Sequence, residues 1–178
     1  EALLRQLLKF QLPSPYHTET TNPDVTFCVK PYLEILRLVY TLEKVTFDEI
    51  MIFGMQLTSY TKFDEVIQKI LKFRKAKENN RGSYKNFMGK YRDDEIFSIF
   101  SDDIQQGNTK TRESKDASVA KFIKTKASNQ RDYTDACFRY LRATGLVSVS
   151  YTHLRAHETP EHLVCRLLLE KKKKTNKT

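Results

Sequence analysis

The sequence predicts a mainly α-helical fold, a helical bundle, on three observations. Apolar residues recur every three or four positions in several segments, as they do on the buried face of an amphipathic helix. Two of these segments follow a helix-start signal, which is a proline in one case and a capping box in the other. Before residue 146, no segment alternates apolar and polar residues as a half-buried strand does.

The first 42 residues predict two helices separated by a loop. Four leucines near the start form an apolar stripe on a short helix. Residues 11–24 contain three prolines together with several Thr, Ser and Asn, and this composition is typical of a loop. Pro31 stands where helices often begin, and the apolar residues after it predict a helix that ends near residue 42.

Two further helices are predicted before residue 80. Thr46 and Glu49 have the capping-box spacing T-x-x-E, which predicts a helix over 47–57. The longest helical pattern, 61–79, is heavily cationic toward its far end. Because the connections between these helices are short, we expect a small bundle or a first helix-turn-helix, so that residues 1–79 form one helical subdomain.

Residues 80–116 are expected to be a linker and the start of a second subdomain. The stretch 80–95 is polar, has two glycines and interleaves aromatic residues with cations, so it is either a linker or a helix that lies against DNA. Apolar residues then predict a buried helix near 93–104. The polar run 106–116 is typical of a loop and is the segment most prone to disorder.

The most strongly marked helix lies at 131–144, after a shorter one at 118–126. Asp132 can cap its start. Gly145 can end it in the left-handed conformation, after which residues 146–148 turn extended. Five of its residues share one face and are expected to be buried, namely Tyr133, Ala136, Cys137, Tyr140 and Leu141.

The order of the last elements is that of a winged helix-turn-helix. Helices near 93–104, 117–126 and 131–144 are followed by a strand, as the third helix of such a domain is followed by its first wing strand. Residues 117–148 are therefore expected to form a winged-helix core. Its wing is expected to be truncated, which leaves a sheet edge unpaired.

The formal net charge of +9 favours a polyanionic partner, but the charge is unevenly distributed. Residues 149–178 contain seven Lys/Arg and three Asp/Glu, which is +4, so residues 1–148 carry +5. No apolar run approaches the roughly 20 residues that a membrane-spanning helix needs. The three cysteines are widely spaced, so a reducing cytosol fits, and Cys28 and Cys137 are expected to be small core residues.

Residues 149–174, VSYTHLRAHETPEHLVCRLLLEKKKK, resemble the translation of a sequencing-library adapter that runs into an A-rich stretch. His153 and His157 are four positions apart, with His162 and Cys165 nearby, as helical metal ligands often are. Because of the adapter resemblance, residues 149–178 are interpreted as an artefactual C-terminal tail. No metal site and no other function is assigned to them.

No catalytic site is predicted in residues 1–148. A metal-dependent nuclease of the common restriction-enzyme type needs an acidic residue and an E-x-K or D-x-K strand, which hold Mg²⁺ and the attacking water. Asp24 and the segment 113–115, Glu-Ser-Lys, match this pattern of residue types. However, both lie in segments whose composition is typical of loops, and they are about ninety positions apart. The acidic clusters at 93–95 and 102–103 are interpreted as helix starts and solvated faces, and His17 as an ordinary loop or core histidine.

Basic residues between positions 112 and 142 predict a surface that contacts nucleic acid. Phosphate contacts set affinity and register, whereas contacts to base edges set specificity. Arg131 and Asn129 are candidate base readers at a helix start, since Arg pairs with guanine and Asn with adenine. The alternative is that all these residues form ordinary solvated faces. The predicted DNA contacts are Arg112, Lys115, Lys121, Lys124, Lys126, Asn129, Arg131, Arg139 and Arg142.

Three long phrases of the chain resemble the AlwI family of type IIS restriction endonucleases. They cover most of residues 2–147 and read LLRQLLKFQLPSPYH, FCVKPYLEILRLVYTLEKVTFDEIMIFGMQLTSYTKFDEVIQKILKFR and KTKASNQRDYTDACFRYLRATGLV. The resemblance implies a DNA-recognition half made of helical and winged-helix subdomains, similar in plan to the FokI recognition region. It also implies a separate C-terminal nuclease domain that cuts at a fixed offset with Mg²⁺, and it places no catalytic residue in this chain.

Three functions follow as hypotheses. The first is the DNA-recognition region of a type IIS restriction or nicking endonuclease, whose cutting domain lies beyond this fragment. The second is a winged-helix DNA-binding regulator without nuclease activity, and the third is a helical interaction module with no DNA role. The expected partner is double-stranded DNA rather than a membrane, the fragment itself is expected to need no cofactor, and a cytoplasmic monomer is the expected free state.

Overall fold

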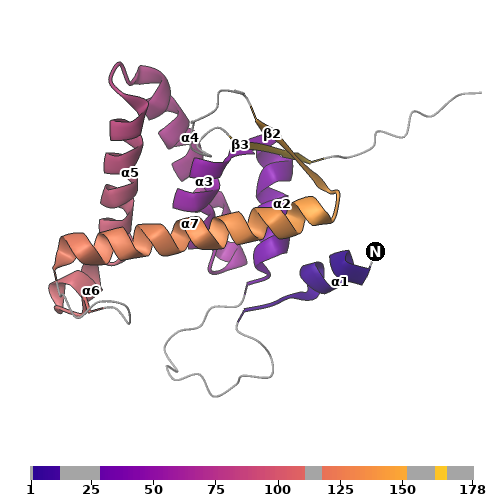
Figure 1. Cartoon of the computed structure of the whole chain (residues 1–178), viewed down its shortest axis with the longest axis horizontal. Helices are drawn as coiled ribbons and strands as arrows, with labels where there is room; N and C mark the ends of the chain where they lie inside the picture. Colours follow the sequence, from indigo (N-terminus) through magenta and orange to yellow (C-terminus); the bar gives the residue numbers. More distant parts are fainter. Residues whose placement is uncertain (1, 13–28, 111–117, 152–162, 168–178) are drawn as a thin grey trace, which may run out of the picture.

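The computed structural model describes residues 2–12, 29–110, 118–151 and 163–167, and in these ranges the chain is mainly helical, as predicted (Figure 1). The α-helices are α1 (Ala2–Lys9), α2 (Pro31–Leu42), α3 (Phe47–Ile52), α4 (Phe63–Asn79), α5 (Tyr84–Ile99), α6 (Ser101–Gln105) and α7 (Val119–Ala143). Two short 3-10 helices, η1 (Gly54–Gln56) and η2 (Tyr60–Lys62), and three strands, β1 (Lys44–Thr46), β2 (Val147–Tyr151) and β3 (Leu163–Leu167), complete the described elements.

Helix α3 begins as the capping box predicts. The Thr46 hydroxyl accepts a hydrogen bond from the Glu49 N–H at 3.3 Å, and the Glu49 carboxylate accepts one from the Thr46 N–H at 2.8 Å. These bonds satisfy donors that a helix start leaves free. The helix ends at Ile52 rather than near residue 57, and the chain tightens into η1. A Cβ on Gly54 would lie 2.9 Å from a side-chain carbon of the preceding turn, so this turn needs a glycine.

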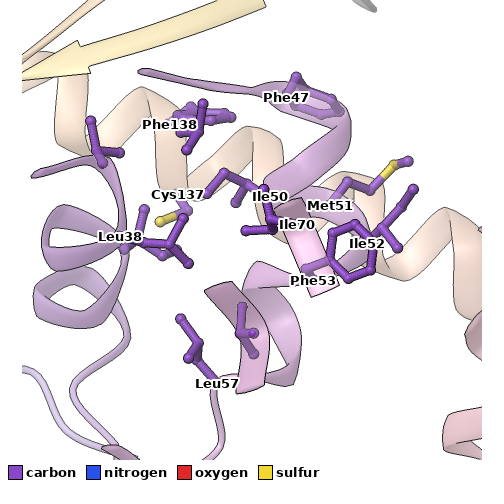
Figure 2. Close-up of a cluster of buried hydrophobic side chains, with 14 of the residues drawn as sticks. Leu38, Phe47, Ile50, Met51, Ile52, Phe53, Leu57, Ile70, Cys137 and Phe138 are labelled. Carbon is purple, nitrogen blue, oxygen red and sulfur yellow. The ribbon is translucent and has the colours of Figure 1, made fainter. Parts of the chain in front are cut away.

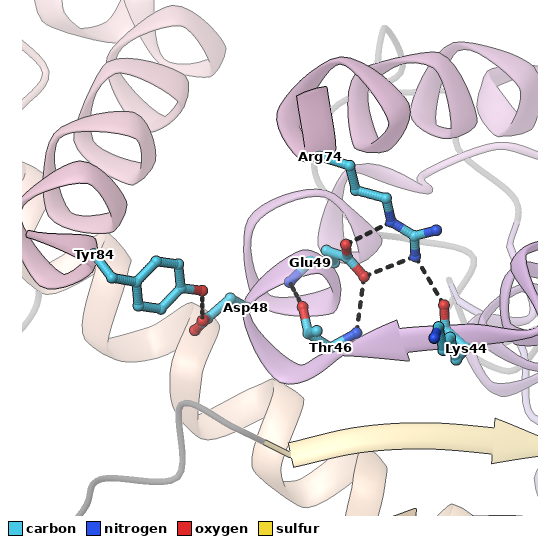
Figure 3. A network of polar contacts seen from close by, with 6 residues as sticks. All are labelled: Lys44, Thr46, Asp48, Glu49, Arg74 and Tyr84. Carbon is cyan, nitrogen blue, oxygen red and sulfur yellow. Dashed lines mark hydrogen bonds and ion pairs between the residues drawn. The ribbon is translucent and has the colours of Figure 1, made fainter. Parts of the chain in front are cut away.

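Arg74 connects α4 to both α3 and β1 (Figure 3). Its Nε donates to Glu49 Oε1 at 2.7 Å, and its Nη2 donates to Glu49 Oε2 at 3.0 Å and to the Lys44 carbonyl at 2.8 Å. The Glu49 side chain is only 4% exposed, so its charge needs this bidentate partner. The same carboxylate therefore caps α3 and positions α4.

One hydrophobic cluster connects α2, α3, α4, α5 and α7 (Figure 2). Leu38, Ile50, Phe53 and Phe73 are among its fully buried side chains. Burying a side chain of this size contributes roughly 1.5–3 kcal/mol. The cluster contains residues from both sides of position 80, so the core is shared across that position. The division of the chain into separate subdomains stays a prediction.

The helix-turn-helix predicted from residues 117 to 144 is wrong, because α7 is one continuous helix. The Ser118 hydroxyl accepts a hydrogen bond from the Lys121 N–H at 3.4 Å and caps its start. The expected turn, 127–130, contains neither glycine nor proline, so nothing in it interrupts the helix. Asp132 consequently lies inside α7 and is exposed, instead of capping a new helix.

The buried face of α7 is rotated relative to the expected one. Tyr133 and Tyr140 are 67% and 50% exposed, so the prediction that both lie in the core is wrong. Thr134 and Phe138 are buried instead. The Thr134 hydroxyl donates to a backbone carbonyl one turn earlier at 2.7 Å, which satisfies this polar group inside the protein. Of the five residues expected to be buried, Cys137 and Leu141 are buried and Ala136 is half-buried.

The segment after α7 is extended, as predicted, and Gly145 before it has the expected left-handed backbone with a φ of 70°. Strand β2 does not end at Ser148 as a truncated wing would, but continues to Tyr151 and pairs antiparallel with β3. Strand β3 also pairs antiparallel with β1, which gives the sheet order β1-β3-β2. The winged-helix assignment and the adapter origin of residues 149–174 stay predictions.

Helix α5 covers most of the stretch 80–95, so this stretch is a helix rather than a linker. The expected helix at 93–104 is the end of α5 together with α6, and Phe100 separates the two. Residues 106–110 form a turn and loop, whereas 111–117 lie outside the described residues. None of the helices in the described part of the chain has the length and apolarity to span a membrane.

Candidate nucleic-acid interface

A groove with a volume of about 520 Å³ lies where α3, α5 and α7 meet. Helices α5 and α7 form its two walls, and on each wall the lining residues are spaced by four and then three positions, which places them on one helix face. The residues with this spacing are Lys85, Gly89 and Arg92 on α5, and Lys124, Ser128 and Arg131 on α7. Each wall therefore presents a cation at either end and a small residue between them.

The floor of the groove is apolar except for one carboxylate. Phe47, Met51 and Met88 line it and are buried. Asp48 on α3 also lines it and is 4% exposed. The Tyr84 hydroxyl on α5 donates a hydrogen bond of 2.6 Å to Asp48 Oδ2, which fixes the carboxylate (Figure 3). The groove thus combines an apolar floor, a buried hydrogen-bond acceptor and a cationic rim.

Helix α7 brings two of the predicted DNA contacts, Lys124 and Arg131, into this groove. Lys121 is exposed one turn before Lys124 and continues the same helix face. Arg142 is exposed in the last turn of α7. Lys121, Lys124 and Arg131 therefore form a row of cations along one side of the helix, which we call the α7 cationic row.

Two other predicted contacts have partners within the protein. The Lys126 Nζ lies 4.3 Å from the centre of the Phe100 ring and 5.0 Å from that of Phe122. An ammonium held over two rings gains a cation–π attraction. Arg139 forms an ion pair of 2.6 Å with Asp135, and both side chains are at least half exposed, so this pair adds little stability.

Asn129 and Arg131 do not form the expected pair of base readers at a helix start. Both lie in the middle of α7, and two positions along a helix correspond to nearly opposite faces. Asn129 is half-buried, whereas Arg131 is exposed and lines the groove. Arg112 and Lys115, the remaining predicted contacts, lie outside the described residues.

No residue of the α5 wall, such as Lys85 or Arg92, was among the predicted DNA contacts, although a helix that lies against DNA was one of the two alternatives for 80–95. The Arg92 Nε and Nη2 both donate to Asp93 Oδ1, at 2.9 and 2.7 Å, which orients the guanidinium. A signal was present, because cations alternate with aromatic residues in the stretch 80–95. Their regular spacing on one helix face could have identified the wall. Asp48 was missed because its burial depends on contacts distant in the sequence.

The acidic clusters at 93–95 and 102–103 and the thiol of Cys137 have structural roles. Glu95 pairs with Lys69 at 2.9 Å, so the cluster 93–95 joins α5 to α4 and is not a helix start. The cluster 102–103 does lie in the first turn of a helix, α6. Burial raises the pKa of Cys137 from 9.0 to about 12. Cys137 is therefore a core residue, as predicted, and not a nucleophile.

Within the ranges that the structure describes, no group of three or more His, Cys, Asp or Glu could hold a metal ion. The candidates from the sequence, Asp24, residues 113–115 and His17, fall outside these ranges, as does Cys28. The groove itself offers groups suited to binding, namely cations at its rim, an apolar floor and a buried carboxylate.

Comparison with known proteins identifies the family. The model of the AlwI restriction endonuclease family matches residues 1–178, the whole chain. A search of curated proteins gave no match. Restriction endonucleases bind DNA, and this agrees with the cationic groove between α5 and α7. The chain belongs to the AlwI family of restriction endonucleases.

Proposed function

We propose that this chain is the DNA-recognition region of a type IIS restriction or nicking endonuclease and binds a short specific duplex site. The observation that carries the proposal is the pair of cationic walls, with identical spacing, on α5 and α7 of an AlwI-family chain. Family membership favours this function over a DNA-binding regulator without nuclease activity and over an interaction module with no DNA role.

The spacing of the walls suits a DNA backbone. Seven residues separate the two cations of each wall, which is about 10 Å along a helix at 1.5 Å per residue. This length corresponds to about three base steps at 3.4 Å per step on one strand. The lysine of each wall can therefore contact a phosphate and set the register of the protein on the duplex, while the arginine of the same wall reaches the duplex about three steps away.

Cutting is assigned to a separate nuclease domain, as the resemblance to the family implies, with Mg²⁺ as its cofactor. No residue of this chain receives a catalytic role in the proposal. The free protein is proposed to be a monomer that acts in the cytoplasm. Recognition and cutting then occupy different parts of the enzyme, which allows cleavage at a fixed distance from the bound site.

Substitutions in the α7 cationic row test the proposal. Changing Lys121 and Lys124 together to Ala should weaken binding to all duplexes alike, because lysines contact phosphates. Arg131→Ala should instead relax the preference at one base pair, at a cost of about 1–3 kcal/mol. Fluorescence anisotropy on a duplex library, followed by sequencing of the bound fraction, measures both effects. Lys72→Ala on α4, which is exposed and lies away from the groove, is the control.

Weak binding that is insensitive to salt and equal for all these variants would contradict the proposed function. If binding depends on salt but Lys72→Ala weakens it as much as the Lys121/Lys124 double variant does, the contact surface lies elsewhere.

A further inference from the structure

We infer that Arg92 on the α5 wall reads a guanine base in the bound site, and that Asp93 positions Arg92 for this role. The role rests on the proposed function, because it requires bound duplex DNA. It deepens that function by assigning part of the specificity to one side chain and to one edge of one base.

The Arg92 guanidinium is held along one of its edges. Its Nε and Nη2 donate hydrogen bonds of 2.9 and 2.7 Å to the same oxygen of Asp93, Oδ1. A planar guanidinium bound through two donors cannot turn without losing one of these bonds. Within the part of the chain that the structure describes, the Arg92 side chain forms no other hydrogen bond or ion pair. Its orientation is therefore set before DNA binds.

The donors that remain on Arg92 match the major-groove edge of guanine. An arginine has five N–H groups, so three stay available, two on Nη1 and one on Nη2, after Asp93 accepts two. The free end of the guanidinium thus carries two parallel N–H groups. Guanine presents two neighbouring acceptors, O6 and N7, on this edge, whereas adenine presents an acceptor beside a donor. A pair of fixed donors therefore favours guanine.

Arg92 lies where a base edge can approach it. It lines the α5 wall together with Lys85 and Gly89. A Cβ on Gly89 would meet no atom within 4 Å, so the wall leaves open space between its two cations and a DNA strand can lie close to the helix. The Arg92 side chain is 33% exposed despite its bond to Asp93, so the held guanidinium is still accessible to a duplex.

Arg131, which faces the groove from α7, has no comparable support. It is exposed, and among the described residues its side chain has no hydrogen-bond or ion-pair partner. Immobilising a long side chain on binding lowers affinity by about 2- to 12-fold. Arg92 is already ordered in the free protein, so it avoids most of this loss. The carboxylate of Asp93 also offsets the charge of Arg92, which suits it to a base edge better than to a phosphate.

A selection of the full chain over a duplex library tests the role of Arg92. The bound fraction is sequenced for the wild type and for each variant. Arg92→Ala should relax the preference at one G·C pair by roughly 5- to 150-fold, the value of one bidentate contact, and leave other positions unchanged. It should also keep the slope of log K against log salt, whereas loss of a phosphate contact would reduce the slope by about 0.9.

Two further variants test whether Asp93 acts through Arg92. Asp93→Ala should reduce the preference at the same G·C pair by about 2- to 12-fold, because Arg92 is then no longer ordered in advance. Asp94→Ala removes the same charge from an exposed neighbour on α5 and should not change the preference. The double variant Arg92→Ala/Asp93→Ala should match Arg92→Ala alone, since a positioning residue has no effect once its target is gone.

Modified bases test the contact without any change to the protein. In 7-deazaguanine a carbon replaces N7, whereas inosine lacks only the exocyclic amino group that guanine presents in the minor groove. At the selected G·C pair, 7-deazaguanine should raise the Kd of the wild type at least about fivefold and that of Arg92→Ala less than about twofold. Inosine should change neither Kd by more than about twofold. Fluorescence anisotropy measures these values.

Failure of the inference and failure of the proposed function give different results. If the wild type selects a site but Arg92→Ala keeps every preference, relaxes an A·T pair, or weakens all sequences alike, the role of Arg92 is overturned and the function stands. Additive losses in the double variant, or equal losses from Asp93→Ala and Asp94→Ala, overturn the role of Asp93. A wild-type protein that selects no site from the library overturns the function itself.

Discussion

Residues on α7 illustrate how a periodic pattern can locate a helix and still misplace its face. Tyr133 and Tyr140 are aromatic and were expected inside, yet both are exposed, since a tyrosine has an apolar ring and a polar tip. Tyr140 packs its ring edge-to-face on Tyr32, with 6.1 Å between centroids. Thr134 is polar by type, but a hydrogen bond within the helix allows its burial. Residue type alone does not reveal either arrangement.

Structural features that depend on neighbouring residues were predicted more reliably than contacts between residues far apart in the sequence. The capping box of Thr46 and Glu49 and the left-handed Gly145 depend on atoms within a few residues, and the structure confirms both. The bond between Glu49 and Arg74 joins residues 25 positions apart. No pattern in the sequence selects Arg74 over the neighbouring cations as that partner.

Cys137 should be unreactive in the folded protein. Its thiol is buried, and its pKa is raised to about 12 because burial disfavours the thiolate. Alkylation by iodoacetamide at pH 8, followed by mass spectrometry of the peptide that contains Cys137, should be about 100-fold slower than in denaturant. Equal rates in the two conditions would show that the α7 face around Cys137 is open to solvent.

The same pKa shift predicts a pH dependence of stability. A thiol whose folded pKa lies above its unfolded value stabilises the fold below about pH 9, and this stabilisation is lost as the pH rises toward 12. The unfolding free energy of the wild type should therefore fall more steeply over this window than that of Cys137→Ala. Parallel curves for the two proteins would contradict the burial of the thiol.

Among the secondary-structure elements, α7 and β1 are two that the sequence patterns did not predict correctly. Helix α7 was divided in two because Asp132 can cap the start of a new helix, whereas the chain runs through Asp132 as one continuous helix. Strand β1 has three residues and lies in a segment expected to be a turn. Such a strand is too short to show alternation, and its partner β3 is about 120 positions away.

A proline at position 129 distinguishes one helix from two. Asn129→Pro should cost about 3 kcal/mol or more in a continuous α7, because it removes a hydrogen bond and clashes with the preceding turn. Asn129→Ala should change stability by less than about 0.5 kcal/mol. Urea denaturation of both variants measures the difference. A proline tolerated as well as the alanine would restore the predicted turn.

In the whole molecule, folding brings together segments that are far apart in the sequence. The groove takes Asp48 from α3, Lys85 from α5 and Lys124 from α7. Its α7 wall follows from a charge pattern and was predicted, but its α5 wall and its floor depend on how the helices cross. The sheet likewise unites β1, near residue 45, with the strands that follow α7. Patterns in the sequence therefore predicted part of the interface and not its concave shape.

The central claim is that α5 and α7 together bind the DNA backbone, and the salt dependence of duplex binding tests it most directly. The test compares Lys85→Gln/Lys124→Gln, one change on each wall, with Lys72→Gln/Lys75→Gln on the exposed side of α4, which has the same net charge. Losing two phosphate contacts should reduce the slope of log K against log salt by about 1.8 in the groove variant only. Equal slopes for both variants and the wild type would contradict the claim.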